Sequence, residues 1–349
     1  MTEALIDFAL FAAKSLTILA FFGLFALALV RARQHAGDAG DEDGGHLEVI
    51  SLNVSFADMG DAIKSATLPS KVYKKAAKAE RKAEKQRLKA EEKALKRIFV
   101  IDFHGDIMAS EVGGLREMVS AVLIEAGADD EVLVRIDNAG GAVHEHGLAA
   151  SQLLRLRQRD IPLTVAVDKV AASGGYLMAC VANRIIAAPF AIIGSIGVLA
   201  ELPNFHRLLE RNGVDFELHT AGEYKRTLTL FGENTDEARS KLREQLEDTH
   251  QLFKSFIQEY RSDLDVERVA TGEYWHGEQA LALGLVDALQ TSDDYLLSAR
   301  DDAELFKLRY KTRKRPLDRL LGAMQAGVSH LLGLLAARFT APAVRSKLN

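Results

Sequence analysis

A serine followed by two glycines stands where a strand is expected to end and a helix to begin. Ser173 lies in the run Val170-Ala-Ala-Ser-Gly-Gly-Tyr, just after the apolar stretch 162–167. In this position the hydroxyl is exposed at the sheet edge, and the amide of Gly174 at the helix N-terminus points at an oxyanion formed beside it. Serine is also a favoured N-cap residue. The run therefore predicts either a nucleophile or a cap, and Ala171 excludes a Gly-x-Ser-x-Gly elbow.

A second glycine turn follows the preceding strand of the chain. Gly140 and Gly141 end the run Arg135-Ile-Asp-Asn-Ala-Gly-Gly. Glycines at a strand end let a backbone amide turn outward, and two such amides from neighbouring loops form an oxyanion hole. A tight turn without a catalytic role is the alternative. Only the presence of Ser173 one βα unit further along the chain favours an oxyanion hole.

The histidines of the chain offer no convincing base for this serine. His144 and His146 follow the glycine turn, but a two-residue spacing on a helix points them apart, so we expect surface or pocket-rim side chains. The remaining candidates, His104, His206 and His219, stand in no context that explains a catalytic role.

Lys225 is the other candidate base. It lies in Ala221-Gly-Glu-Tyr-Lys-Arg-Thr. A lysine acts as a base near neutral pH only where burial and apolar surroundings lower its pKa from about 10.4. From its residue type alone, a single lysine is more often a surface charge.

Strands and helices alternate around these residues. Apolar runs predict strands over 98–103, 131–136 and 162–167, and helical spacing predicts helices over 111–125 and 141–158. This order is typical of βαβ units and a parallel sheet, in which sites form at the carboxyl ends of the strands.

The apolar stretch 185–200 resembles a membrane span in hydropathy. It has only sixteen residues and is broken by Pro189, Gly194 and Gly197. We therefore expect a buried strand and a glycine-rich turn, because strands covered on both faces are apolar throughout.

The N-terminal residues predict a membrane anchor over 1–33. Residues 5–30 are mostly apolar and are followed by Arg31 and Arg33. A cleaved signal peptide is the alternative, but the charged sequence after Val30 offers no neutral mature start. The arginines favour a cytoplasmic position for the rest of the chain.

Composition separates a linker from one folded domain. Residues 34–97 form a polar spacer that continues into a basic Ala-, Lys- and Glu-rich stretch, expected to be a solvated helix or disordered. That stretch, residues 71–97, holds twelve Lys or Arg and four Asp or Glu, a net charge of +8. Because the whole chain has a net charge of −5, the remaining residues carry −13. Overall charge thus gives no support for nucleic-acid binding. Cys180 is the only cysteine, which excludes an internal disulfide and a zinc site built on paired cysteines.

The motifs together resemble the signal peptide peptidase A family of serine peptidases. The stretches that carry the resemblance are 137–143, 170–180, 194–198 and 221–235, and it extends from the N-terminal anchor to about residue 302. It implies a Clp-peptidase-like, or crotonase-like, α/β spiral domain over 98–302.

The resemblance also implies roles for individual residues. A Ser-Lys dyad falls on Ser173 and Lys225, and an oxyanion hole on the amides of Gly174 and Gly141. The turn Gly194-Ser195-Ile196-Gly197 would line the substrate cleft.

One departure concerns the first glycine turn. Many family members have Ser-Pro where this chain has Asn138-Ala139, so we expect a less preset turn.

Partners follow from the same resemblance. We expect a peptide or protein substrate, membrane lipid at a bacterial inner membrane, no nucleic acid and no cofactor. In this family the lysine can come from a neighbouring subunit, so one copy of each motif predicts a homo-oligomer with Lys225 supplied across the interface. The family's association with exported proteins favours a periplasmic domain, against the charge rule, and the side stays open. Residues 303–349 are expected to be a basic segment and an amphipathic helix over 316–339, packed between protomers or lying on the membrane.

Two other functions remain open at this point. A crotonase-fold enzyme acting on an acyl-CoA thioester also holds an oxyanion with paired amides, although it needs no nucleophilic serine. A non-catalytic membrane scaffold with an inactive site is the third possibility.

Overall fold

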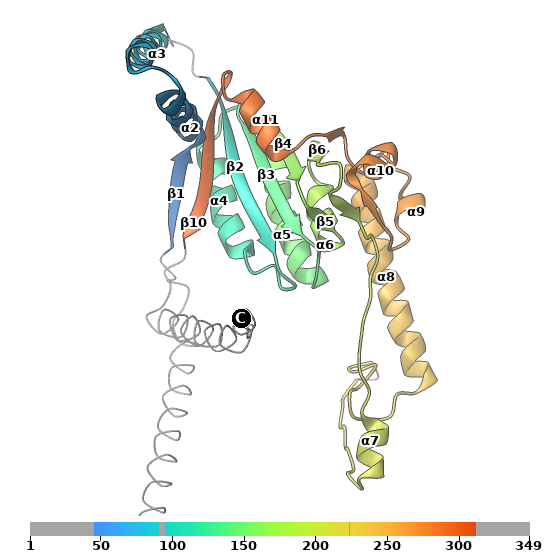
Figure 1. The fold of residues 1–349 in the computed structure, drawn as a ribbon. Helices are drawn as coiled ribbons and strands as arrows, with labels where there is room; N and C mark the ends of the chain where they lie inside the picture. Colours follow the sequence, from blue (N-terminus) through green and yellow to red (C-terminus); the bar gives the residue numbers. More distant parts are fainter. Residues whose placement is uncertain (1–44, 91–94, 223, 312–349) are drawn as a thin grey trace, which may run out of the picture. The chain divides into compact units, whose positions relative to one another are not determined.

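A mixed α/β sheet organises the part of the chain that the structure describes. The computed structural model describes residues 45–90, 95–222 and 224–311, and within these ranges ten strands join one sheet. Its main path runs β1-β10-β2-β3-β4-β6-β9, and Figure 1 labels the strands of this path from β1 to β6. Off this path, β5 pairs with β3, β7 with β5, and β8 with β7. The strands are β1 His46–Ser51, β2 Lys96–Gly105, β3 Glu131–Asn138, β4 Leu163–Val167, β5 Val170–Ala172, β6 Arg184–Ala187, β7 Ile192–Gly194, β8 Tyr274–His276, β9 Ala288–Leu289 and β10 Ala303–Lys311.

The helices follow the strands in the order expected for βαβ units. They are α2 Leu52–Thr67, α3 Ser70–Ala90, α4 Val112–Glu125, α5 Val143–Arg157, α6 Gly174–Ala179, α7 His206–Arg211, α8 Asp236–Tyr260, α9 Val266–Val269, α10 Gly277–Ala282 and α11 Ser292–Ala299. Neighbouring strands from β10 to β9 along the main path are parallel. The predicted strands and helices between residues 98 and 167 are confirmed, with ends that differ by a few residues.

Two apolar clusters lie on opposite faces of the sheet. Phe99, Ile101 and Phe103 of β2 join the larger cluster, which includes the apolar residues of α4 and α5. Ile98 and Val100, which alternate with them, join the smaller cluster with Leu296 of α11. Burial of alternate residues on both faces explains why the strand is apolar almost throughout.

The apolar stretch 185–200 contains strands, as its length and glycines predicted. It forms β6 and β7, and their residues Ile185, Ile186 and Ile193 are fully buried. Among the described residues, no helix is both long and apolar enough to cross a membrane. The predicted anchor over 1–33 and the helix over 316–339 lie outside the described residues.

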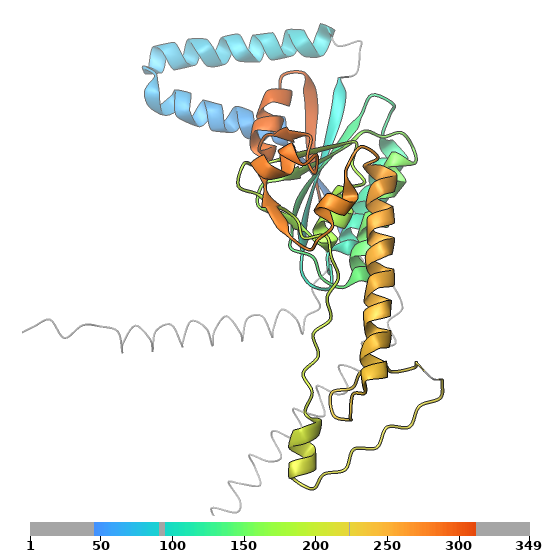
Figure 2. The same cartoon turned by 90° about the vertical axis from the view of Figure 1, so that its right-hand side faces the viewer.

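The mobile spacer predicted before the basic stretch was wrong from His46 onward, because β1 and α2 form there, and the fold extends past both predicted ends of the domain. β1 pairs with β10 in antiparallel register from His46↔Lys311 to Ser51↔Phe306. Leu52 and Phe56 of α2 pack against the smaller cluster, so this segment buries apolar surface that the strand edge would otherwise expose. The basic stretch adopts the helical alternative as α3, which follows α2 directly (Figure 2).

Candidate active site

Ser173 lies at a strained turn between β5 and α6. Its φ of 51° and ψ of −118° are unusual for a residue other than glycine. The turn is held on both sides, because the Ser173 amide donates to the Gly194 carbonyl at 2.7 Å and the Ser173 carbonyl accepts from Leu177 at 2.9 Å. The side chain makes no capping hydrogen bond to α6, so the N-cap alternative does not account for this serine. In α/β-hydrolases, a strained strand-to-helix turn is how the nucleophilic serine is exposed.

The first glycine turn abuts Ser173 directly. β3 ends beside β5, where Asn138 pairs with Ala171. Gly140 has φ of +93°, and a Cβ built on it would lie 2.7 Å from Ser173 Cβ and 2.8 Å from the Gly174 nitrogen. A side chain at this position therefore has neither a relaxed backbone nor free space.

The next residue of the turn is equally constrained. A Cβ on Gly141 would lie 2.2 Å from the Ile107 carbonyl oxygen, which accepts a hydrogen bond from the Ala142 amide at 2.8 Å. The loop after β2 thus fixes the glycine turn from behind.

The two amides predicted to bind an oxyanion are not used by the hydrogen bonds of the described part of the chain. Among the described residues, neither the Gly141 nor the Gly174 amide donates a hydrogen bond. The Gly140 amide, by contrast, donates to Asn138 Oδ1 at 2.7 Å. An asparagine side chain can close a turn by accepting a hydrogen bond from the backbone two residues on, and this bond fixes the turn in that way. From the absence of Ser-Pro we had expected a less preset turn.

The turn 194–197 lies next to Ser173 through the hydrogen bond to the Gly194 carbonyl. Gly194 and Ser195 both have positive φ, 98° and 49°. The Ser195 amide donates to the Glu273 carbonyl at 2.7 Å. The Ile196 side chain is fully buried in the larger cluster and anchors the turn, so any part of this residue that lines the predicted cleft is its backbone. Ser195 and Gly197 are half-buried and keep accessible surface.

Lys225 lies in the long connection between β7 and α8. Its side chain is exposed, and its amide donates to the Gly222 carbonyl at 3.2 Å. Within the described residues of this chain, no hydrogen bond or ion pair joins it to Ser173. The connection is held together locally by rings, with centroids of Phe205 and Phe216 6.1 and 5.8 Å from that of Phe231.

The histidines are distributed differently from the expectation. His144 is exposed as predicted, with 77% of its side chain accessible. His146 is fully buried, so its prediction as a surface or rim residue was wrong. It lies on the α5 face that also carries Ala149, Ala150 and Leu153, one turn from the glycine turn. His104 and His219 are exposed and lie near Glu111 and Glu217.

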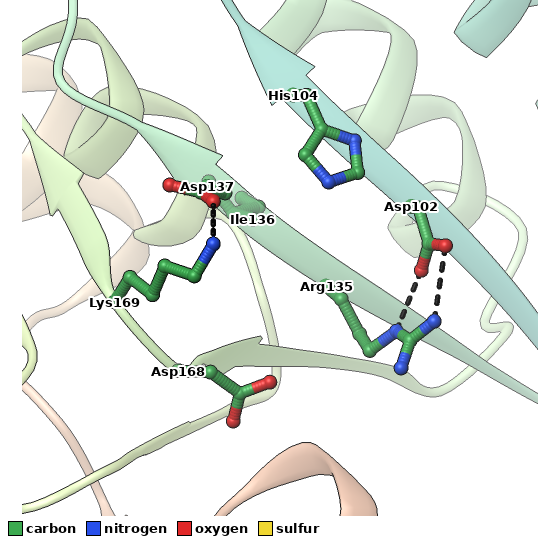
Figure 3. Close-up of a pocket in the computed structure, with 7 residues that line it drawn as sticks. All are labelled: Asp102, His104, Arg135, Ile136, Asp137, Asp168 and Lys169. Carbon is green, nitrogen blue, oxygen red and sulfur yellow. Dashed lines mark hydrogen bonds and ion pairs between the residues drawn. The ribbon is translucent and has the colours of Figure 1, made fainter. Parts of the chain in front are cut away.

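A charged pocket that the sequence did not reveal lies at the carboxyl ends of β2, β3 and β4. It has a volume of about 200 Å³ and is lined by Asp102, His104, Arg135, Ile136, Asp137, Asp168 and Lys169 (Figure 3). The polar side chains at alternate positions of β2 and β3 were its signal.

The carboxylates of this pocket are all paired. Burial raises the pKa of Asp102, but hydrogen bonds from Arg135 and Lys307 outweigh it, and the pKa is held below its usual range. Lys169 lies 3.0 Å from Asp137 Oδ2. Asp168 accepts from the amide and hydroxyl of Ser292, at the start of α11. We therefore attribute this pocket to ion pairs and hydrogen bonds that hold the strand ends and the start of α11 together.

Comparison with known proteins defines the class to which this fold and site belong. Residues 155–306 match the family model "Peptidase family S49", and residues 3–153 match "Peptidase family S49 N-terminal". The chain belongs to peptidase family S49. The matches confirm the resemblance that the motifs indicated.

Within this family, the chain is similar to proteins named "Probable protease SohB". The chain is 46% identical over 325 residues to the "Probable protease SohB" of Haemophilus influenzae, covering 90% of this chain and 91% of the relative. It is 45% identical over 307 residues to a protein of the same name from Buchnera aphidicola subsp. Schlechtendalia chinensis, covering 85% of this chain and 99% of the relative. Among solved structures, a 1510-N membrane-bound stomatin-specific protease in complex with a substrate peptide aligns with 14% identity and a TM-score of 0.41, covering 66% of this chain and 99% of that one.

Proposed function

We propose that the chain is a serine endopeptidase in which Ser173 is the nucleophile and Lys225 the general base. The observation that carries the proposal is the strained Ser173 turn, whose side chain is not used as a cap and which abuts the Gly140 turn. Ser173 Oγ attacks the scissile carbonyl carbon while its proton passes to Lys225 Nζ. The same proton then goes to the leaving amine, and water releases the acyl group from the serine.

The oxyanion of each tetrahedral intermediate is proposed to bind the amides of Gly141 and Gly174. Both donors come from backbone fixed by neighbours, so they need little reorganisation during the reaction. A donor held in this way typically contributes about 3 kcal/mol to transition-state stabilisation. Ser195 and Gly197, with Gly194, are proposed to line the cleft beside Ser173.

Lys225 is proposed to reach Ser173 of a neighbouring subunit in a homo-oligomer. Its exposure, and the lack of any described contact with Ser173 in its own chain, support this arrangement. The connection that carries it also exposes large apolar side chains, among them Leu208, Val214 and Phe216. Contiguous exposed apolar surface often marks a protein interface.

The finer fold and setting belong to the same proposal. The branch of β5, β7 and β8 from the main sheet supports a Clp-peptidase-like, crotonase-like spiral. Residues 1–33 are proposed to anchor the protein in the bacterial inner membrane. The substrates are proposed to be signal-peptide remnants or other membrane-associated or exported polypeptides.

Covalent labelling tests the nucleophile and separates a peptidase from an acyl-CoA enzyme. A fluorophosphonate probe is expected to label the full-length protein in detergent at Ser173, and Ser173→Ala should abolish labelling. Casein cleavage is expected in the wild type and in the control Arg226→Ala, which removes the neighbouring exposed cation, but not in Ser173→Ala or Lys225→Ala. Equal cleavage by all four proteins would leave no role for the dyad.

Mixing the inactive variants tests the origin of the lysine. When Ser173→Ala and Lys225→Ala chains are co-expressed, some subunit pairs combine an intact serine with an intact lysine from the neighbour. Activity is expected to return in the mixed oligomer. If the lysine acts within its own chain, the mixture stays inactive.

A further inference from the structure

His146 occupies a position where an apolar side chain would fit the pattern of its helix. The next residues on that face of α5 are Ala149, Ala150 and Leu153, all fully buried in the larger cluster. The imidazole is also fully buried. Burying a polar ring is unfavourable unless both nitrogens find partners, so the partners indicate why a histidine stands here.

Both partners of the ring lie at the ends of the first glycine turn. Nδ1 lies 3.0 Å from the carbonyl oxygen of Ala142, and Nε2 lies 3.3 Å from Oδ1 of Asn138. Asn138 is the last residue before the turn and Ala142 the first after it, with Gly140 and Gly141 between them. The ring therefore spans the turn from one end to the other.

The oxygens that face the ring are acceptors. The Ala142 carbonyl only accepts, and Asn138 Oδ1 already accepts from the Gly140 amide at 2.7 Å. A neutral imidazole carries one N–H, so the ring donates to one of these two oxygens, and its tautomer decides which. It shares Asn138 Oδ1 with the amide of the turn itself, which couples the orientation of the turn to the histidine.

The same ring contacts the second turn of the site. A Cβ built on Gly174 would lie 2.4 Å from Cγ and 2.6 Å from Cδ2 of His146, so the glycine backbone rests directly on the imidazole. Gly175 packs against Asn138, because a Cβ on this glycine would lie 2.2 Å from the Asn138 carbonyl oxygen. His146 and Asn138 consequently touch both loops that carry the proposed oxyanion donors.

We propose that His146 is a positioning residue that keeps the amides of Gly141 and Gly174 aligned on one oxyanion. The inference rests on the function proposed above and adds a residue to its site. His146 reaches neither substrate nor solvent, and acts only through Asn138 and the two turns. Its effect belongs to the transition state, because an oxyanion develops only there.

Three variants of α5 separate positioning from packing. His146→Leu fills the site with an apolar side chain of moderate volume and removes both ring nitrogens that contact the turn. His146→Gln keeps an amide donor that reaches toward Asn138. His144→Leu, two residues away on the same helix at an exposed position, is the matched control.

The measurements are kcat and KM on a fluorogenic peptide, the rate of fluorophosphonate labelling, and the melting temperature of the full-length protein. Loss of one oxyanion donor lowers kcat by roughly 10²–10³-fold, so misalignment in His146→Leu is expected to lower it about 10–100-fold with KM nearly unchanged. Labelling should slow in parallel, because the phosphonyl oxygen uses the same amides. His146→Gln is expected to recover most of the rate, and His144→Leu to match the wild type.

A double-mutant cycle with Asn138→Ala tests whether His146 acts through Asn138. If His146 acts through Asn138, the double variant should lose little more rate than the more affected single variant. Multiplicative losses would overturn the proposal, as would a wild-type kcat in His146→Leu. Equal losses of kcat and of melting temperature in His146→Leu and His146→Gln would mean packing alone and also overturn it. A wild type that the probe does not label at Ser173 would instead refute the proposed function.

Discussion

Gly140→Ala tests whether the two glycine turns work as one packed unit. The substitution adds a Cβ at φ of +93°, where it would meet Ser173 Cβ at 2.7 Å, the Gly174 nitrogen at 2.8 Å and the Ala172 carbonyl oxygen at 2.9 Å. Two of these neighbours are backbone atoms, so no flexible side chain can move aside. The strain must therefore be taken up by the Ser173 turn.

The expected cost has two parts. Holding an alanine at this φ costs about 1–3 kcal/mol, and forcing an extra carbon into a filled site costs about 1–3 kcal/mol more. Together these amount to a large fraction of the roughly 5–15 kcal/mol by which domains are stable. Displacement of the Gly174 amide should also lower the rate of Ser173 labelling by about 10-fold or more.

Gly284→Ala provides the matched control. Gly284 has φ of +78°, but a Cβ there would meet only Leu264 Cδ1 at an ordinary 3.7 Å. Its variant is expected to lose about 1–3 kcal/mol from backbone strain alone and to keep the wild-type labelling rate. Urea unfolding and labelling kinetics on both variants separate strain from crowding. Equal destabilisation of the two, with wild-type labelling in Gly140→Ala, would refute the close packing of the turns.

Three further outcomes follow from local structure. Gly147→Ala, in α5 with open space around the position, is expected to raise the free energy of unfolding by about 0.5–1 kcal/mol in urea titrations. Hydrogen bonds from Arg135 and Lys307 lower the pKa of Asp102 in the folded protein, so the stability that this carboxylate contributes is fully present above about pH 4 and is lost as pH falls through its folded-state pKa. Asp102→Asn should therefore weaken the fall of the melting temperature at acid pH. Burial raises the pKa of the Cys180 thiol, so a disulfide reagent at pH 8 should react only after denaturation, and rapid reaction of the native protein would contradict its burial.

Much of the sheet could be predicted because its strands are short apolar runs separated by turn residues. The strand from Lys96 and the stretch 162–167 have this pattern, and both form strands. β1 escaped prediction because its residues are mostly exposed or half-buried, and its partner β10 lies at the far end of the described chain. Pairing of this kind depends on tertiary contacts rather than on local pattern.

The site was predicted from glycines and a serine, and the error at His146 has a physical cause. Helical spacing alone cannot tell whether the face carrying Ala149 and Ala150 points inward or outward at its first turn. The sequence also did not show that Asn138 would close the turn with its side chain, because that depends on the local backbone. The burial of the Ile196 side chain was not predicted for a similar reason, since a glycine-rich turn does not reveal which way its one large side chain points.

The pairing of β1 with β10 has a mechanical consequence. His46 and Lys311 face each other at the open end of the antiparallel pair, and the partners continue inward to Ser51 and Phe306. Tension applied between residues 46 and 311 would pull across the strands and separate their hydrogen bonds one after another, whereas a pull along the strands would load them all together. β1 can thus be unzipped under modest force while β3 and β5, several strands away, keep the Ser173 turn in place.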